Sequence, residues 1–342
     1  MIVNAYATHR EPPPLEFAHQ LRARRDRDDP ELGPHLQGFA GFVMANGERE
    51  MTALRYGVLH HLERVHHHLA FETEDSQGLE RWARDANALL FLDDGTVRAP
   101  DGKVLVDPET GEPEPGAALP YPADATARKT ATDLALAERG ITIPPSLPPT
   151  ISAIEVELRE PREVAARVLS LFICAVRAEG LGEGNPLEVE VIRERVPRGF
   201  DALTPIEAAF MAEASPDEQA VMTHVWRYEA IVPLAWALGL VEQLAFPTAI
   251  CDVPGLAKTI LNLDADTLLA TATLRPVAEI LDALDQTFRL HWAVVDAQVR
   301  EADPPAELEG ELEGGVITER HHALNWLTRF GDADWDEVET PT

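Results

Sequence analysis

The stretch that decides the fold is residues 226–241, WRYEAIVPLAWALGLV, the one long segment of the chain that is apolar almost all the way round. A helix with apolar side chains on every side must be buried, because it has no face to turn toward water. On the side that carries Met222, Trp236 and Leu240, Glu229 is the only ionisable group. We therefore expect the helices after residue 160 to pack around this segment, with one carboxylate in the core.

Two further helices are predicted to turn a histidine inward. The helix expected over residues 276–301 carries apolar side chains at alternating spacings of four and three, and His291 lies on that stripe. In the helix expected over residues 316–329, His321 lies on the apolar side and Asn325 follows one turn later. This spacing predicts that both imidazoles point into the core.

The opposite face of the 276–301 helix carries two acid–base pairs. Asp285 and Arg289 are four residues apart, as are Asp296 and Arg300, with the acid first in each pair. Such pairs on an exposed helix face contribute about 0.2–0.5 kcal/mol each. We interpret all four residues as surface contacts of the helix.

The inward groups on the three helices are candidate catalytic residues: Glu229, His291 and His321. A buried carboxylate without a partner costs several kcal/mol on transfer estimates, so Glu229 must be protonated or find a donor. The two imidazoles, Arg227 and Arg320 are the available donors. If the three groups meet, they predict a general acid–base or metal site; otherwise they are a polar network that fixes how the helices dock.

Other residues offer weaker indications of a site. We take Trp226, Arg227, Arg320 and Asn325 as candidate binding residues. No histidine pair four apart encloses a glutamate, so no metal site is predicted there, and no motif identifies a cofactor. The N-terminal half contains a dense histidine group, which fits either a metal site or exposed histidines at a strand end. Its members are His60, His61, His66, His67 and His68.

The N-terminal region alternates between helical and strand periodicity, which predicts a small α+β sandwich, and a ferredoxin-like topology would fit. Strands are expected over residues 2–7, 36–44, 66–72 and 88–92, and helices over 15–25, 54–63 and 78–86. The domains predicted from this pattern are a small α+β domain over 1–106, a Pro/Gly/Glu-rich linker over 107–122 and a mainly α-helical domain over 123–342.

The composition limits the classes of partner. The formal net charge is -30, from 59 acidic and 29 basic residues, so a phosphate backbone would be repelled and nucleic-acid binding is disfavoured. A protein partner with a basic surface would be attracted. No apolar run is long enough to span a bilayer, and the two cysteines lie among apolar neighbours. We expect a cytoplasmic protein; its oligomeric state is not predicted.

Several C-terminal motifs resemble the bacterial domain-of-unknown-function family 4272, in the family's order from about Arg128 to the C-terminus. These are Trp226 to Glu229, Trp236 to Leu240, Glu279 to Asp282, Arg289 to Ala293, Glu319 to Trp326 and Trp335 to Val338. The N-terminal part looks like the extension of longer members. The resemblance implies no settled activity or cofactor, but it places Glu229, His291 and His321 within matching motifs.

Two functional hypotheses follow from the sequence. The first is a non-catalytic binding or regulatory protein whose acidic surface meets another protein. The alternative is a hydrolase-type enzyme with Glu229, His291 and His321 in one pocket. Geometry distinguishes them, because the enzyme requires the three side chains to come within hydrogen-bonding or shared-metal distance beside a cavity open to solvent.

Overall fold

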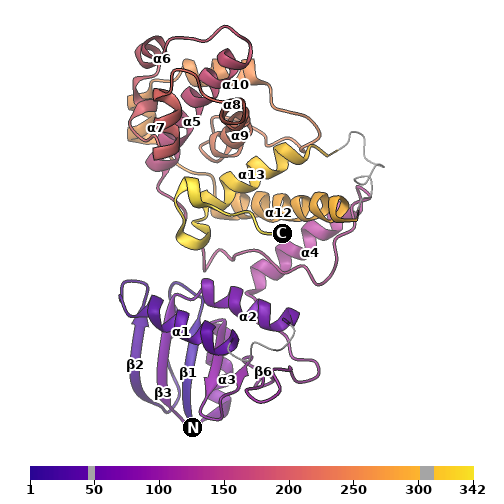
Figure 1. Cartoon of the computed structure of the whole chain (residues 1–342). Coiled ribbons are helices and arrows are strands. Elements are labelled where there is room, and N and C mark those ends of the chain that lie inside the picture. Colours follow the sequence, from indigo (N-terminus) through magenta and orange to yellow (C-terminus); the bar gives the residue numbers. More distant parts are fainter. Residues whose placement is uncertain (45–50, 301–311) are drawn as a thin grey trace. The chain divides into compact units, whose positions relative to one another are not determined.

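A computed structural model describes residues 1–44, 51–300 and 312–342 (Figure 1). The chain forms two compact units, in which unit 1 comprises residues 1–126 and 151–156 and unit 2 comprises residues 127–150 and 157–342. The chain therefore passes from one unit to the other after residues 126, 150 and 156. Among the described residues, no helix combines the length and the hydrophobicity that a membrane span requires.

Unit 1 is built on a 6-stranded antiparallel sheet with the strand order β2-β3-β1-β4-β5-β6. The strands are β1 (Ile2–Ala7), β2 (Gln20–Asp26), β3 (His67–Glu72), β4 (Ala88–Leu92), β5 (Val97–Arg98) and β6 (Val104–Val106). Strand β1 is central because both of its faces are apolar. Its Ala5 lies opposite Leu69 of β3 and Leu90 of β4.

Helices cover both faces of this sheet. Helix α3 (Ser76–Asp85) places Leu79 and Trp82 in the core on one face. Helices α1 (Leu32–Met44) and α2 (Ala53–Glu63) pack on the other, where Tyr6 stacks on Phe39 with ring centroids 4.3 Å apart. The α+β class is confirmed. The element order, however, differs from the β-α-β-β-α-β order of a ferredoxin-like fold.

Two predicted elements of unit 1 are wrong. Residues 36–44 were predicted as a strand but belong to helix α1, whose buried Leu32, Phe39 and Val43 follow helical spacing. Its Gly33, Gly38 and Gly41 lie in open space on the outer side, so the glycines do not mark a close backbone approach.

Residues 15–25 were predicted as a helix. They contain instead an irregular segment followed by edge strand β2, because Leu15 and Phe17 pack on the sheet core rather than along a helix stripe.

Residues 107–122, predicted as a linker, belong to unit 1. Within them, Glu114 N–H bonds to Val104 O at 2.8 Å, and Leu119 packs on the core beneath α2.

Unit 2 is helical, and α4 leads into it from unit 1. The α-helices are α4 (Ala123–Ala137), α5 (Pro161–Gly182), α6 (Val189–Arg195), α7 (Pro205–Ala212), α8 (Glu218–Val225), α9 (Arg227–Ala237), α10 (Val253–Leu261), α11 (Ala265–Thr271), α12 (Val277–Val299) and α13 (Gly314–Leu327). Three 3-10 turns, η1 (Pro197–Phe200), η2 (Phe330–Asp332) and η3 (Trp335–Glu337), complete it. The predicted capping box of Thr204 and Glu207 starts α7.

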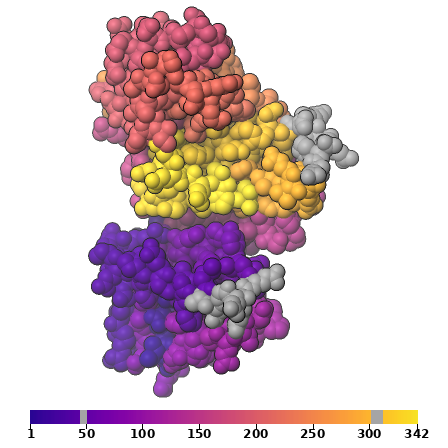
Figure 2. Space-filling model, in the orientation of Figure 1, coloured from indigo at the N-terminus to yellow at the C-terminus, as the bar shows by residue number. Residues whose placement is uncertain are grey.

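Helix α9 is the buried centre of unit 2, as residues 226–241 predict. Every residue from Tyr228 to Ala237 is buried, and α9 packs against α5 on one side and α13 on the other. The helical stretch is shorter than expected, because α8 ends at Val225 and α9 ends before Gly239, which has a left-handed φ of 73°. On the face shown in Figure 2, α13 and the C-terminal residues form one continuous band of unit 2.

Candidate functional site

Four consecutive residues of α13, from Glu319 to His322, each contact a different residue outside this helix. Successive side chains on a helix point about 100° apart, so a run of four faces in four directions. Glu319 pairs with Arg227 of α9, at 2.9 Å, and His321 bonds to His291 of α12. Arg320 faces Glu229, and His322 contacts the C-terminal Trp335. This run thus links α13 to α9, to α12 and to the C-terminal residues.

Glu229 is buried between α13 and the loop that follows α9. Its Oε1 accepts a hydrogen bond from the Cys251 N–H at 2.5 Å, and its Oε2 lies 3.9 Å from the Arg320 guanidinium. Arg320 also donates to Ala245 O at 2.5 Å. These contacts attach the loop, at Ala245 and at Cys251, to Arg320 and Glu229. Glu229 Oε1 therefore has a hydrogen-bond donor, whereas Oε2 has none among the described residues and is met only by the longer contact with Arg320.

The thiol of Cys251 beside Glu229 is a poor nucleophile. Burial, followed by the adjacent Glu229 carboxylate, raises the pKa of Cys251 to about 12. Catalytic thiols need the opposite, a pKa near or below neutrality. The Cys251–Glu229 contact therefore gives no support to thiol chemistry.

His291 and His321 point inward as predicted, with exposed fractions of 7% and 2%. Their Nδ1 atoms lie 2.8 Å apart, so one nitrogen donates its proton and the other accepts it. Burial, and then repulsion from His291, lowers the pKa of His321 to about 3, and burial also lowers the pKa of His291. Both rings are neutral near pH 7 and joined to each other.

The three candidate catalytic groups do not form one cluster. Glu229 bonds to Cys251 and faces Arg320, whereas His291 and His321 bond to each other. Among residues 1–44, 51–300 and 312–342, no group of three His, Cys, Asp or Glu side chains could hold a metal ion. Of the three groups that the hydrolase hypothesis requires, only the two imidazoles come within hydrogen-bonding distance of each other.

The candidate binding residues all take part in packing. Arg227 forms its ion pair with Glu319, and Asn325 donates to the backbone carbonyl of Glu339 at 2.9 Å. Trp226 is half-buried and its ring lies against Gly315, where an added Cβ would come within 2.7 Å. These contacts explain why a glycine occupies the first turn of α13.

A second buried ion pair was not predicted from the sequence. Arg167 of α5 and Glu207 of α7 are bonded to each other, with side-chain exposures of 5% and 4%. Glu207 also accepts from the Thr204 N–H at 2.9 Å, which links the pair to the start of α7. The capping box was a signal for Glu207, but nothing in the local sequence pairs it with a residue 40 positions earlier.

The surface interpretation of Asp285 and Arg289 is wrong. Both side chains are fully buried, and the guanidinium forms two hydrogen bonds to the carboxylate, at 2.8 and 2.9 Å. The segment that precedes α5 covers this side of α12, where Thr150 bonds to Asp285 and Pro148 to Arg289. The second pair does lie at the surface, since the Arg300 side chain is 68% exposed.

The N-terminal histidines have structural partners. His61 donates to Tyr6 O at 3.0 Å, His66 to Glu155 O at 3.1 Å and His67 to Arg10 O at 2.7 Å. Burial is the main cause that lowers the pKa of His61 to about 3 and that of His66 to about 4. Because their Nε2 atoms face backbone carbonyls, the three rings are docking groups of unit 1.

The C-terminal strap, which we define as residues 330–339, carries the most concentrated set of exposed carboxylates among the described residues of unit 2. Trp335 anchors it, with 3% exposure, against Arg167, Arg227 and His322. Arg159 donates to the strap at Ala333 O, at 2.6 Å. The exposed acidic side chains of the strap are Asp332, Asp334, Asp336, Glu337 and Glu339.

The comparisons with known proteins agree with the C-terminal motifs. A family model described as "Domain of unknown function (DUF4272)" matches residues 128–338. No curated protein and no solved structure matches the chain. The matched range contains α9, α12, α13 and Trp335 of the strap, and the N-terminal α+β unit precedes it. The chain therefore belongs to the DUF4272 family.

Proposed function

We propose that this chain is a non-catalytic binding protein of the bacterial cytoplasm, whose C-terminal strap recognises a partner with a basic surface. The observation that carries the proposal is a contrast within unit 2. Its buried ionisable groups contact one another or backbone carbonyls of the same unit, whereas the strap presents exposed carboxylates on an anchored backbone. The two free cysteines, Cys174 and Cys251, fit a reducing compartment.

The strap carboxylates are available for a partner. No ion pair joins Asp334, Asp336, Glu337 or Glu339 to a basic side chain in the part of the chain that the structure describes. Asp332 lies 3.7 Å from Arg329, in an exposed pair of little energetic value. Four unpaired charges within six residues create a local negative potential that would steer a basic surface toward them.

The strap is also preorganised. Trp335 is buried among two arginines, a histidine and Trp326, and the backbone is held at Ala333 and Glu339. A surface that is already ordered loses little conformational entropy when a partner binds. This separates the strap from an ordinary acidic tail, which would have to be ordered first.

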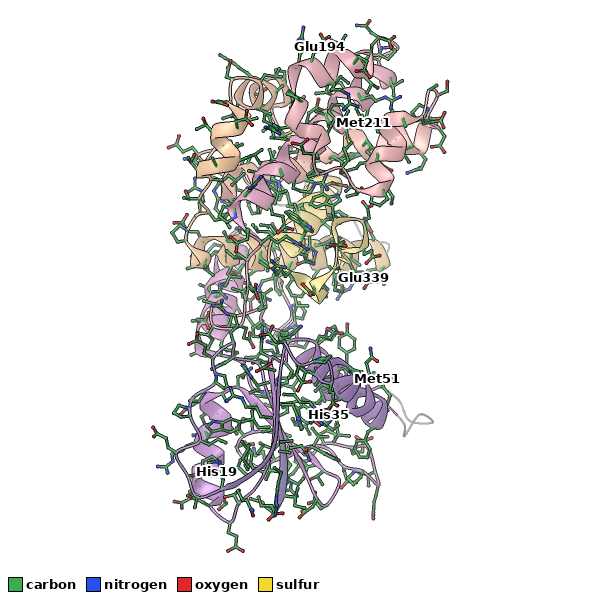
Figure 3. The ribbon with its side chains drawn as sticks, turned by 90° about the vertical axis from the view of Figure 1, so that its left-hand side faces the viewer. His19, His35, Met51, Glu194, Met211 and Glu339 are labelled. Atoms are coloured by element: carbon green, nitrogen blue, oxygen red, sulfur yellow. The ribbon has the colours of Figure 1, made fainter. Side chains whose placement is uncertain are left out.

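A matched pair of variants tests the proposal. The strap variant carries Asp334→Asn, Asp336→Asn, Glu337→Gln and Glu339→Gln. The control carries four Glu→Gln changes at exposed positions of the α5–α6 region, Glu183, Glu188, Glu190 and Glu194. Both variants change the net charge equally, and Figure 3 shows Glu194 and Glu339 well apart on unit 2.

The probe is a fluorescent octalysine peptide, measured by anisotropy at ionic strengths of about 0.01 and about 0.15 M, where the Debye lengths are about 30 and 8 Å. Four surface contacts of about 0.35 kcal/mol each sum to about 1.4 kcal/mol, so the strap variant should bind about tenfold more weakly. The control should retain most of the affinity. Equal weakening in both variants would show that only bulk charge is sensed, and the strap proposal would fail.

A further inference from the structure

Unit 1 contains a pocket of about 220 Å³ that lies outside the residues matched by the family model. It opens between the end of α3, the turn after β5 and the loop that precedes α4. The polar lining comes from Asn87, Asp101, Tyr121 and Arg84, and the apolar walls include Pro100 and Pro120. All of these residues belong to unit 1.

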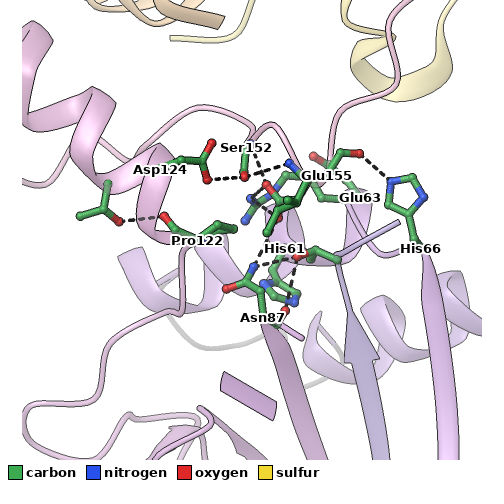
Figure 4. Close-up of polar contacts among 12 residues, drawn as sticks. His61, Glu63, His66, Asn87, Pro122, Asp124, Ser152 and Glu155 are labelled. Carbon is green, nitrogen blue, oxygen red and sulfur yellow. Dashed lines mark hydrogen bonds and ion pairs between the residues drawn. The ribbon is translucent and has the colours of Figure 1, made fainter. Parts of the chain in front are cut away.

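Asn87 is one of the lining residues of this pocket, and its side-chain amide has a fixed orientation. The residue is 2% exposed and has a left-handed backbone, with a φ of 47°. Its Nδ2 donates to Thr8 Oγ1 at 2.7 Å and to Glu155 Oε1 at 3.3 Å. Figure 4 shows the amide nitrogen turned toward Glu155 and the amide oxygen turned away from it. Oδ1 has no hydrogen-bond donor among the described residues.

The orientation of this amide is dictated by its neighbour. Glu155 is fully buried and receives two hydrogen bonds from Arg64, at 3.1 and 3.2 Å, and one from the Ser152 N–H at 2.9 Å. An ionised carboxylate accepts hydrogen bonds and donates none. The Asn87 group that faces it is therefore the NH₂, which leaves the amide oxygen of this pocket-lining residue free to accept a hydrogen bond.

The remaining polar lining also favours a ligand that donates hydrogen bonds. Asp101 is an exposed carboxylate, and one of its oxygens accepts from the Lys103 N–H at 3.2 Å. The Tyr121 ring is backed by the Arg64 guanidinium, 5.4 Å from the ring centroid, and its hydroxyl has no partner among the described residues. Arg84 is already paired with Glu80 at 2.6 Å. This pair is exposed, so it holds Arg84 only weakly, but its two charges balance. Asp101 has no ion pair among the described residues, so the unbalanced charge of the lining is negative.

We propose that this pocket binds a guanidinium group, such as the end of an arginine side chain. A guanidinium presents several donors in a plane, which suits the Asn87 carbonyl oxygen together with the Asp101 carboxylate. The prolines and the Tyr121 ring supply apolar contacts for its methylene stem. The volume equals about seven waters at about 30 Å³ each, close to the size of a guanidinium with a three-carbon stem. The net charge of -30 raises the local concentration of cations.

The experiment compares two probes of nearly the same shape, N-acetylarginine amide and N-acetylcitrulline amide, titrated into the full chain and followed by calorimetry. Citrulline replaces the charged guanidinium with a neutral urea. The arginine probe should bind at least about tenfold more tightly, since the lost charge-assisted bond to Asp101 is worth about 1.4 kcal/mol or more. Equal binding of both probes, or no binding of the arginine probe, would overturn the proposal.

Two variants place the binding in the pocket. Asp101→Asn removes the charge but keeps the acceptor for Lys103, and Tyr121→Phe removes only the hydroxyl, so neither should disturb folding. Each should weaken the arginine probe severalfold, and Glu74→Gln, at an exposed position elsewhere in unit 1, should not. If Asp101→Asn and Glu74→Gln bind the probe alike, the pocket is not the site. The strap variant should bind as the wild type does, so failure here and failure of the strap proposal are distinguishable.

Discussion

The buried pair of Asp285 and Arg289 offers the sharpest test of how unit 2 is held together. Replacing Arg289 by Met keeps much of the apolar stem but leaves the Asp285 carboxylate without its main partner. Asp285 is 0% exposed and would retain only the Thr150 hydroxyl, at 3.0 Å. Removing one partner of a buried ion pair typically costs about 3–5 kcal/mol, because the other charge stays desolvated. We expect a loss of that size for Arg289→Met.

The same helix supplies the control. Arg300 follows Asp296 at the same four-residue spacing, but its side chain is 68% exposed, so Arg300→Met should cost about 0.5 kcal/mol or less. Urea unfolding followed by tryptophan fluorescence reports mainly on unit 2, which contains Trp226, Trp236, Trp292, Trp326 and Trp335. In the double variant Asp285→Asn with Arg289→Met, part of the loss should return, because no unpaired charge remains buried. Equal effects of Arg289→Met and Arg300→Met would refute the reasoning.

Three further predictions concern unit 2. Burial lowers the pKa of His321 to about 3 and that of His322 to about 4, whereas an exposed histidine has a pKa of 6.5. Below pH 6.5 the unfolded chain therefore binds more protons at these two residues than the folded chain does. The free energy of unfolding should therefore fall as the pH drops from about 6.5 toward 4, by up to about 1.4 kcal/mol per pH unit for each ring, and urea titrations that show no such slope would contradict this. Trp335→Ala should destabilise the helices by about 3–5 kcal/mol in the same assay, and Trp335→Phe by less. Cys251, with a pKa of about 12, should react with iodoacetamide at pH 8 far more slowly than a peptide thiol, and a comparable rate would show that the thiol is exposed and ionised.

The sequence predicts burial well where the pattern leaves one solution. Residues 226–241 are apolar on every side, so α9 could only be central, and His291 and His321 lie on apolar stripes that could only face inward. The exposure of Asp285 and Arg289 on α12 was predicted wrongly because their pattern allows more than one solution. Four-residue spacing shows that Asp285 can meet Arg289, but it does not show whether another segment covers the pair. Here residues 148–150, about 140 positions earlier, provide the cover.

The failures in unit 1 have a similar physical origin. A short apolar run such as residues 36–44 fits either a buried strand or a helix, and only its packing partners decide. Residues 36–44 joined α1 because Leu32 extends the helical stripe by one turn. Edge strand β2 was missed because it is exposed, with arginines and an aspartate rather than alternating apolar residues. Its identity comes from pairing with β3, a contact that spans more than forty residues.

The pairing around α13 limits where function can be found in this protein. Glu319 and its partner Arg227 are 92 residues apart in the sequence, and His321 and His291 are 30 residues apart. The choice of partner therefore depends on how the helices cross. A substitution in the run from Glu319 to His322 removes a contact that holds α13 to its neighbours, which destabilises the fold whether or not the residue binds anything. Loss of activity in such variants would therefore not identify a site. The exposed strap carboxylates, and Asp101 and Tyr121 beside the unit 1 pocket, can be changed without disturbing a buried pair, so a loss of binding there can be assigned to the contact itself.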